Sequence, residues 1–423
     1  MVLALLLIFI ILIVLLLFKI HIFHPAGLFA IVWIAFCIGS IATLGSRYSF
    51  PFKGVTWILL SVLLYILPQA FFSFKYSEEK QNTSKIPNIS WGMLLCFIAL
   101  AFGSVVFNMV KNGILINALG SFSSLLNISH SLAVLRYSGK VSSSTIEQIL
   151  NLFIYVSPLC CGYSFVYAND RKKKMVCFVS IVPVLLLVLI TNAKLALIAY
   201  VILFFIGFYV SYLNKNKSYF KVKLNLKIIL LGLAAAGIFF VLIYLSFLLR
   251  VGTTDIDPNI IITKIGEYAF GHIQGFDTWY SSIKANTVDY GLGINTFLAI
   301  SARLGVAEKV SGIYTFIPGS CTNVYTQFRP LIEDWGMVLS LFWILALGII
   351  TVATCNTMIQ KDRANIGSQV LLSMILFWDL YFIASAWVYT SYIFIFFVFA
   401  FFIFYAYNRK TITQIESSHI YEE

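Results

Sequence analysis

The sequence predicts an all-α, polytopic integral membrane protein, and three observations support this fold class. The 423 residues are 60% hydrophobic and only 11% charged, whereas soluble domains carry about 25% charged residues. The mean hydropathy is +0.92. Apolar runs long enough to cross a bilayer as helices recur along the whole chain. These runs do not alternate in polarity as barrel strands do, so we expect helices.

The apolar runs predict about eleven spans. The first run, 2–18, has no basic n-region and no small-residue cleavage site, so we interpret it as a span and not as a signal peptide. The predicted spans are 2–18, 27–45, 55–74, 91–110, 148–168, 175–191, 195–213, 228–248, 336–355, 367–386 and 388–407.

Basic connectors predict the orientation of these spans. Lysine and arginine gather at 171–174, 215–227, 361–363 and 409–410, and the positive-inside rule places such connectors in the cytoplasm. The two larger polar stretches, 110–147 and 249–335, then face outward. We therefore expect three segments: 1–248 with helices and one external loop, 249–335 as a large periplasmic loop, and 336–423 with helices and a short cytoplasmic tail.

The net charge of +12 would suggest nucleic acid in a soluble protein. Here the basic residues belong mainly to cytoplasmic connectors that face anionic lipid, so we expect membrane lipid and no nucleic acid as a partner. The chain has no CxxC or histidine-rich spacing, so neither a metal site nor another cofactor is predicted.

Cations near the external membrane surface are candidate anion ligands. Arginine binds phosphate oxygens through a planar fork that keeps its charge. We assign this role to Arg250, Arg303 and Arg329, with Lys194 and Arg136 as further candidates. The alternative for Arg250 and Lys194 is that each is an interfacial residue whose charged end reaches water.

Titratable groups in the same stretch are candidate proton acceptors. His272 can take a proton near neutral pH and is our first choice, with Asp334 or Glu333 as the second. The alternative for His272 is an ordinary hydrogen-bonding role. Asp379 interrupts an apolar run and is a functional candidate by position, or else it pairs with a neighbouring group.

Three short motifs resemble the Wzy-type O-antigen polymerases, also called oligosaccharide repeat unit polymerases. They are Gly-His-Ile-Gln-Gly-Phe-Asp at 271–277, Gly-Leu-Gly at 291–293 followed by Thr296-Phe297, and Thr-Asn-Val-Tyr-Thr at 322–326 leading to Glu-Asp-Trp-Gly at 333–336. The layout is also similar, with about eleven spans and a dominant external loop late in the chain.

This resemblance implies a metal-independent glycosyltransferase of the bacterial inner membrane with a fold like that of GT-C enzymes. It would transfer a growing glycan from undecaprenyl pyrophosphate to the non-reducing end of a lipid-linked repeat unit, on the periplasmic side. A chain-length regulator is an implied partner. Trp279 and Tyr325 would stack on sugars or form part of an interfacial belt, and Asp277 and Asn323 would bind glycan hydroxyls.

Two other functions use the same lipid-linked oligosaccharide. A flippase would show internal repeats and intramembrane charges along a cavity, whereas here the charges concentrate in one external stretch and we find no repeat. An O-antigen ligase shares the donor but uses another acceptor, and only the short motifs separate it from a polymerase.

Overall fold

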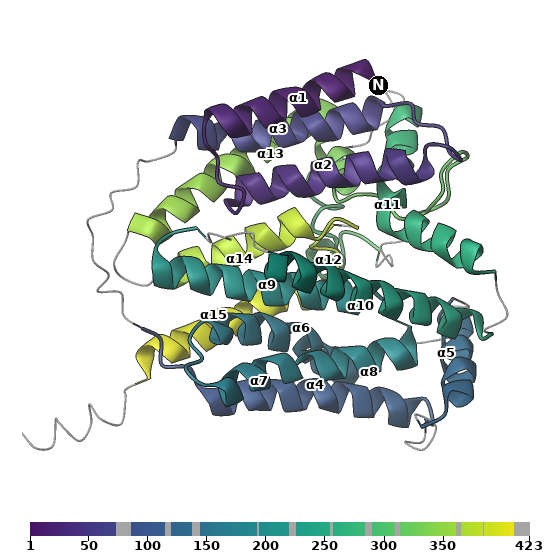
Figure 1. Ribbon diagram of the computed structural model, residues 1–423, viewed down its shortest axis with the longest axis vertical. Coiled ribbons are helices and arrows are strands. Elements are labelled where there is room, and N and C mark those ends of the chain that lie inside the picture. The colour runs from purple at the N-terminus through teal and green to yellow at the C-terminus, as the bar shows by residue number, and fades with distance from the viewer. Residues whose placement is uncertain are drawn as a thin grey trace, which may run out of the picture. The chain divides into compact units, whose positions relative to one another are not determined.

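The computed structural model describes residues 1–72, 86–114, 120–137, 144–192, 194–219, 226–253, 257–283, 290–308, 314–360, 365–383 and 385–409. In this part of the chain all regular structure is helical (Figure 1). The helices divide between two compact units. Unit 1 holds residues 1–76, 221–354 and 375–392, and unit 2 holds residues 77–220, 355–374 and 393–423.

Unit 1 contains the N-terminal helices and the region predicted as the large loop. Its helices are α1 (Val2–Leu17), α2 (Pro25–Leu44), α3 (Lys53–Phe72), α10 (Leu226–Val251), α11 (Pro258–Ser282), α12 (Leu298–Arg303), most of α13 (Phe328–Gln360) and the end of α14 (Ile366–Leu380). Helices α1, α2 and α3 pack side by side (Figure 1).

Unit 2 contains α4 (Trp91–Lys111), α5 (Phe122–Tyr137), α6 (Thr145–Phe165), α7 (Arg171–Val179), α8 (Ile181–Thr191), α9 (Lys194–Asn216) and most of α15 (Thr390–Asn408). Helix α6 packs along both α4 and α9. A Cβ atom on Gly162 of α6 would collide with the backbone of α9, and one on Gly207 of α9 with the backbone of α6. Small residues therefore permit this close approach of two helices.

The membrane-protein prediction is confirmed at the level of class. Within the described ranges, eight helices are long and apolar enough to cross a membrane: 25–44, 53–72, 91–111, 145–165, 171–191, 194–216, 328–360 and 390–408. The other three predicted spans coincide with shorter apolar helices, Val2–Leu17, Phe240–Val251 and Ile366–Leu380. A count of eleven therefore stays a prediction.

The described part of 249–335 includes the end of α10, all of α11 and α12, and the start of α13, whereas the sequence predicted a loop. Helix α11 begins at an Asp257-Pro258 pair, where the Asp257 carboxylate accepts the N–H of Asn259 and proline occupies the first turn. Helix α11 packs on α2 and α3. The two compact units also cut across the three segments expected from hydropathy.

Candidate functional site

Asp277 fixes α11 to the start of α3. Its two carboxylate oxygens accept the backbone N–H groups of Phe52 at 2.8 Å, Gly54 at 2.7 Å and Val55 at 3.2 Å. These donors would otherwise be unpaired in the first turn of α3. Burial raises the pKa of Asp277, and the three N–H donors partly offset this rise. The carboxylate predicted to bind glycan is fully buried and serves as a helix cap in this structure.

Gln274, one turn before Asp277, fixes the segment 314–327 to the same helix. Its Nε2 donates to the carbonyl of Ser49 at 3.1 Å and to that of Gly319 at 3.0 Å. Its Oε1 accepts the N–H of Cys321 at 2.9 Å. The amide is fully buried, so these contacts satisfy it without water and set the position of the segment that carries Tyr314 and Tyr325.

Arg329 lies in an aromatic box formed by three rings. Its Cζ is 3.7 Å from the ring centroid of Tyr314, 4.5 Å from that of Tyr325 and 4.9 Å from that of Trp279. Ring faces attract a guanidinium cation, most strongly where water is excluded, and only 12% of the Arg329 side chain is exposed. Segments from α11, the 314–327 stretch and α13 thus converge on one cation.

Glu333 completes this arrangement one helical turn after Arg329. Its Oε1 accepts the Arg329 Nε–H at 2.8 Å, the i,i+4 geometry expected on a helix. The Arg329 Nη1 is buried and has no hydrogen-bond partner within the described ranges. The Glu333 side chain is 27% exposed. The pair thus presents an unsatisfied cationic donor beside a carboxylate that reaches solvent.

Asp334 organises the neighbouring segment 291–296. Its carboxylate accepts the backbone N–H of Asn295 at 2.9 Å and of Thr296 at 2.6 Å, and also the Asn295 Nδ2 at 3.0 Å. Asp334 is fully buried. Three donors hold both oxygens, so this carboxylate is engaged in positioning a loop.

Helix α13 breaks directly after these acidic residues, at Gly336. Its φ of 72° and ψ of 176° lie in a region that only glycine adopts readily. A Cβ atom at this position would also lie 2.7 Å from the ring of Tyr290. The break separates the short helical segment 328–335, which carries Arg329, Glu333 and Asp334, from the apolar helix that follows.

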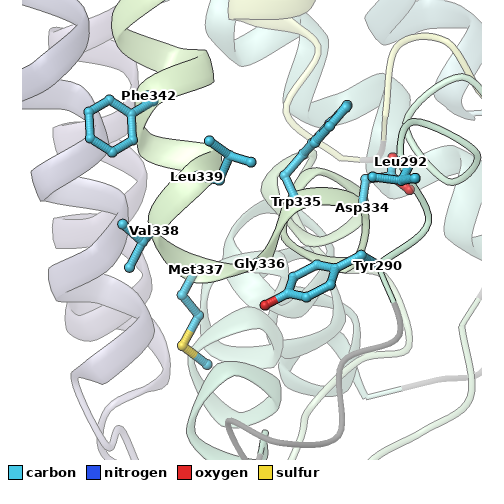
Figure 2. Close-up of a pocket in the computed structure, with 9 residues that line it drawn as sticks. All are labelled: Tyr290, Leu292, Asp334, Trp335, Gly336, Met337, Val338, Leu339 and Phe342. Atoms are coloured by element: carbon cyan, nitrogen blue, oxygen red, sulfur yellow. The ribbon is translucent and has the colours of Figure 1, made fainter.

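A pocket of about 560 Å³ opens at this break. Figure 2 shows Tyr290 beneath the turn at Gly336, with Asp334 and Leu292 on one side and the apolar side chains of α13 on the other. The residues that line the pocket are Tyr290, Leu292, Asp334, Trp335, Gly336, Met337, Val338, Leu339 and Phe342. One end of the pocket is therefore polar, and the wall formed by α13 is apolar.

His272 lies apart from solvent in a second aromatic cluster. It is 2% exposed, and its ring centroid is 4.9 Å from Phe36, 4.9 Å from Phe382 and 6.4 Å from Trp33. Neither ring nitrogen has a hydrogen-bond partner among the residues that the structure describes. Helix α11 is not among the candidate spans, and burial lowers the pKa of His272 to about 3. His272 is thus an enclosed, neutral imidazole in this conformation, which favours a carboxylate over His272 as the proton acceptor.

The other two candidate arginines do not join Arg329. Arg250, at the end of α10, donates to the hydroxyl of Tyr268 on α11, and Arg303 is exposed at the end of α12. Tyr268 and Trp279 are eleven positions apart on α11, which is about 16 Å along a helix axis. Arg250 and Arg329 therefore contact distant parts of α11, and one pyrophosphate cannot bridge both in this conformation.

Three candidate residues remain, namely Lys194, Arg136 and Asn323. Lys194 begins α9 in unit 2 and is partly buried. Arg136 lies in α5, also in unit 2, and its side chain falls outside the described residues. Asn323 is partly buried in unit 1, where its carbonyl accepts the N–H of Tyr314 at 3.2 Å.

Two contributors to the site, Tyr314 and Tyr290, are not among the residues assigned to it from the sequence, although Tyr314 is one of the aromatic residues of 249–335 that could stack on sugars or form an interfacial belt. Tyr314 is the ring closest to the Arg329 guanidinium, and Tyr290 lies against Gly336. Burial, together with the nearby Glu333 carboxylate, raises the pKa of Tyr314, so this ring remains a neutral phenol at physiological pH. The alternation of aromatic and charged residues in 314–335 was the only available signal for Tyr314.

No metal-ligand cluster is apparent in the part of the chain that the structure describes: no three His, Cys, Asp or Glu side chains come together there. Among the charged groups described in unit 1, the Arg329–Glu333 pair joins a buried donor without a partner to a carboxylate that reaches solvent. Comparisons with protein families, with characterised proteins and with solved structures found no match.

Proposed function

We propose that the protein is a surface-polysaccharide polymerase of the O-antigen type. It would transfer a growing glycan from undecaprenyl pyrophosphate to the non-reducing end of a lipid-linked repeat unit, at the periplasmic face of the bacterial inner membrane. One observation carries this proposal. The Arg329–Glu333 pair is largely buried, and aromatic rings enclose its cation. The next residue after Glu333 is Asp334, which lines a pocket with an apolar wall.

The chemistry of the substrate matches these features. A lipid-linked oligosaccharide presents sugars, then a pyrophosphate, then a hydrocarbon chain. Aromatic rings with polar tips such as Tyr314 and Trp279 suit sugar faces, an arginine suits phosphate oxygens, and the apolar side chains Val338, Leu339 and Phe342 suit hydrocarbon. Arg329 and the apolar wall both belong to α13, and the rings of Trp279 on α11 and Tyr314 in the 314–327 stretch lie against Arg329.

The reaction needs a base and a stabilised leaving group. An acceptor hydroxyl attacks the anomeric carbon of the donor, and the bond from that carbon to the pyrophosphate oxygen breaks. The pyrophosphate departs with the electron pair, and the hydroxyl proton passes to a base. In our proposal Glu333 takes the proton, because its carboxylate reaches solvent and is oriented by Arg329.

Arg329 has the second role in this scheme. Negative charge grows on the pyrophosphate as the glycosidic bond breaks, so a fixed cation stabilises the transition state more than the ground state. The Nη1 donor of Arg329 is buried without a partner among the described residues, and a phosphate oxygen would satisfy it. The aromatic box holds the guanidinium in place before substrate binds.

A deletion strain tests the proposal against its rivals. Loss of the gene should collapse the lipopolysaccharide ladder to core plus one repeat unit, and the intact gene supplied in trans should restore the ladder. Loss of every repeat unit, including the first, would contradict polymerase activity and indicate a flippase or a ligase. Accumulation of long lipid-linked polymer in that strain would then identify the ligase.

A further inference from the structure

A buried acid in unit 1 takes no part in the proposed mechanism. Asp379, on α14, is fully buried. Its Oδ2 lies 2.8 Å from the hydroxyl of Tyr65 on α3. Its Oδ1 is buried and has no hydrogen-bond partner in the part of the chain that the structure describes.

The contact between Asp379 and Tyr65 is the first of three consecutive hydrogen-bonding contacts. The Tyr65 hydroxyl also lies 2.9 Å from Oγ1 of Thr351 on α13. The Thr351 hydroxyl in turn donates to the carbonyl of Leu347 at 2.7 Å. These contacts therefore run from Asp379 through Tyr65 and Thr351 to Leu347, and they join α14, α3 and α13.

The protons available to these three contacts indicate the protonation state of Asp379. Each of the three contacts needs one proton, and the hydroxyls of Tyr65 and Thr351 supply one each. If Tyr65 donates to an ionised Asp379, Thr351 must donate to Tyr65, and its contact with Leu347 then has no proton. A proton on Asp379 completes all three contacts, each with a donor and an acceptor.

The surroundings of the acid agree with this count. Among the described residues, no lysine, arginine or histidine forms an ion pair with Asp379. The neighbouring Trp378 stacks on Phe29 of α2, with ring centroids 5.9 Å apart. Within the part of the chain that the structure describes, the titratable group that contacts Asp379 is Tyr65 of α3, and Thr351 of α13, which contacts Tyr65, is neutral. An ionised carboxylate buried without a counter-charge is strongly disfavoured.

We propose that Asp379 is a proton-binding site, which holds a proton at neutral pH and donates it to Tyr65, so that a carboxylic acid links α14 to α3 and α13. A sodium ion is the competing occupant of such a group of oxygens. The contacts of 2.8 Å and 2.9 Å are ordinary distances for oxygen pairs that share a proton. This inference does not depend on the proposed function.

Infrared spectroscopy of the purified full-length protein tests the proposal. The spectrum at pH 7 should contain the C=O band of a protonated carboxylic acid, and Asp379→Asn should lose that band. Glu267→Gln is the matched control, because the Glu267 carboxylate is paired with Lys264 at 2.6 Å and its loss should remove no acid band. Replacing sodium in the buffer by choline should leave the wild-type band unchanged.

Two results would overturn the proposal. One is a wild-type spectrum that matches Asp379→Asn in the acid C=O region, and the other is an acid band that appears only when sodium is withdrawn. Tyr65→Phe provides a second variant if Asp379→Asn does not fold. It keeps the acid but removes its acceptor, so the band should move to higher frequency, and an unmoved band would also reject the assignment.

Discussion

The Nε atom of Arg329 lies 2.8 Å from Oε1 of Glu333, one turn further along α13. This pair lies in the helical segment 328–335, which precedes the break at Gly336. Three aromatic rings enclose the guanidinium of Arg329. The pair is thus fixed from several directions before any ligand binds. Such fixed charge is the arrangement that stabilises a developing charge without reorganisation.

Arg329→Lys should abolish long polymer although it keeps the positive charge. Lysine lacks the planar fork that stacks between rings and binds two oxygens at once, and we expect the polymerisation rate to fall about 10²-fold or more. The lipopolysaccharide ladder of a deletion strain that carries the variant measures this. Arg303→Lys is the matched control, because Arg303 is exposed, and it should keep the full ladder. A full ladder with Arg329→Lys would reject the role of the guanidinium.

Glu333→Gln should leave the fold intact and stop elongation. The amide keeps the shape of the side chain but cannot take a proton, and loss of a general base typically lowers the rate about 10²–10⁴-fold. Protein level in the membrane and the ladder should be measured together. Glu267→Gln makes the same chemical change at a carboxylate outside the site and should retain activity. Equal activity in the two variants would remove Glu333 from the mechanism.

His272 should make the protein sensitive to acid without taking part in catalysis. The pKa of His272 is about 3 in the folded protein, against about 6.5 for an unperturbed histidine. Between these values only the unfolded state binds the proton, so stability falls as the pH drops below 6.5. The loss at pH 5 is about 2 kcal/mol.

His272→Phe separates this role from catalysis. Phenylalanine suits the cluster of Phe36, Phe382 and Trp33 and cannot titrate. The decline in melting temperature from pH 7 to pH 5, measured in detergent, should become smaller, and the ladder should persist. If the ladder disappears while the protein remains folded, His272 acts in the reaction after all.

Gly336→Ala should destabilise the break between the helical segment 328–335 and the apolar helix that follows. The new Cβ would lie 2.7 Å from the Tyr290 ring, and the backbone conformation alone costs about 1–3 kcal/mol for a residue other than glycine. Gly305→Ala is the control, because Gly305 shares the φ of +72° but has no atom near its Cβ position among the described residues. Melting temperatures should fall more for Gly336→Ala, with loss of the ladder. An equal decrease would show that contact with Tyr290 is unimportant.

Most of the apolar helices could be predicted from the sequence, because an apolar run is a local signal. The run 91–110, for example, became α4 at Trp91–Lys111. Helix α11 was not predicted, because it is not apolar enough to be recognised as a span and its buried residues include Gly271, Gln274 and Asp277. Gln274 and Asp277 are buried because partners distant in the sequence satisfy them, and local patterns do not contain that information.

For the same reason, only part of the candidate site could be predicted from the sequence. Arg329, Glu333, Trp279 and Tyr325 were selected from residue type, and the structure gathers them in one place. The spacing of Arg329 and Glu333 fits one helical turn. The predicted span began at residue 336, however, so residues 328–335 were assigned to the loop and not to a helix. The enclosure of His272 depends on α2 and on Phe382, which only the tertiary structure brings together.

Polymerase activity is measured most directly with the purified protein in vesicles supplied with an undecaprenyl pyrophosphate-linked repeat unit. We expect wild-type protein to form lipid-linked glycans of several repeat units and to release undecaprenyl pyrophosphate, whereas Glu333→Gln should bind the substrate and form none. Movement of the repeat unit across the bilayer without any new glycosidic bond would show that the protein is not a polymerase, and equal elongation by Glu333→Gln would show that Glu333 is not the base.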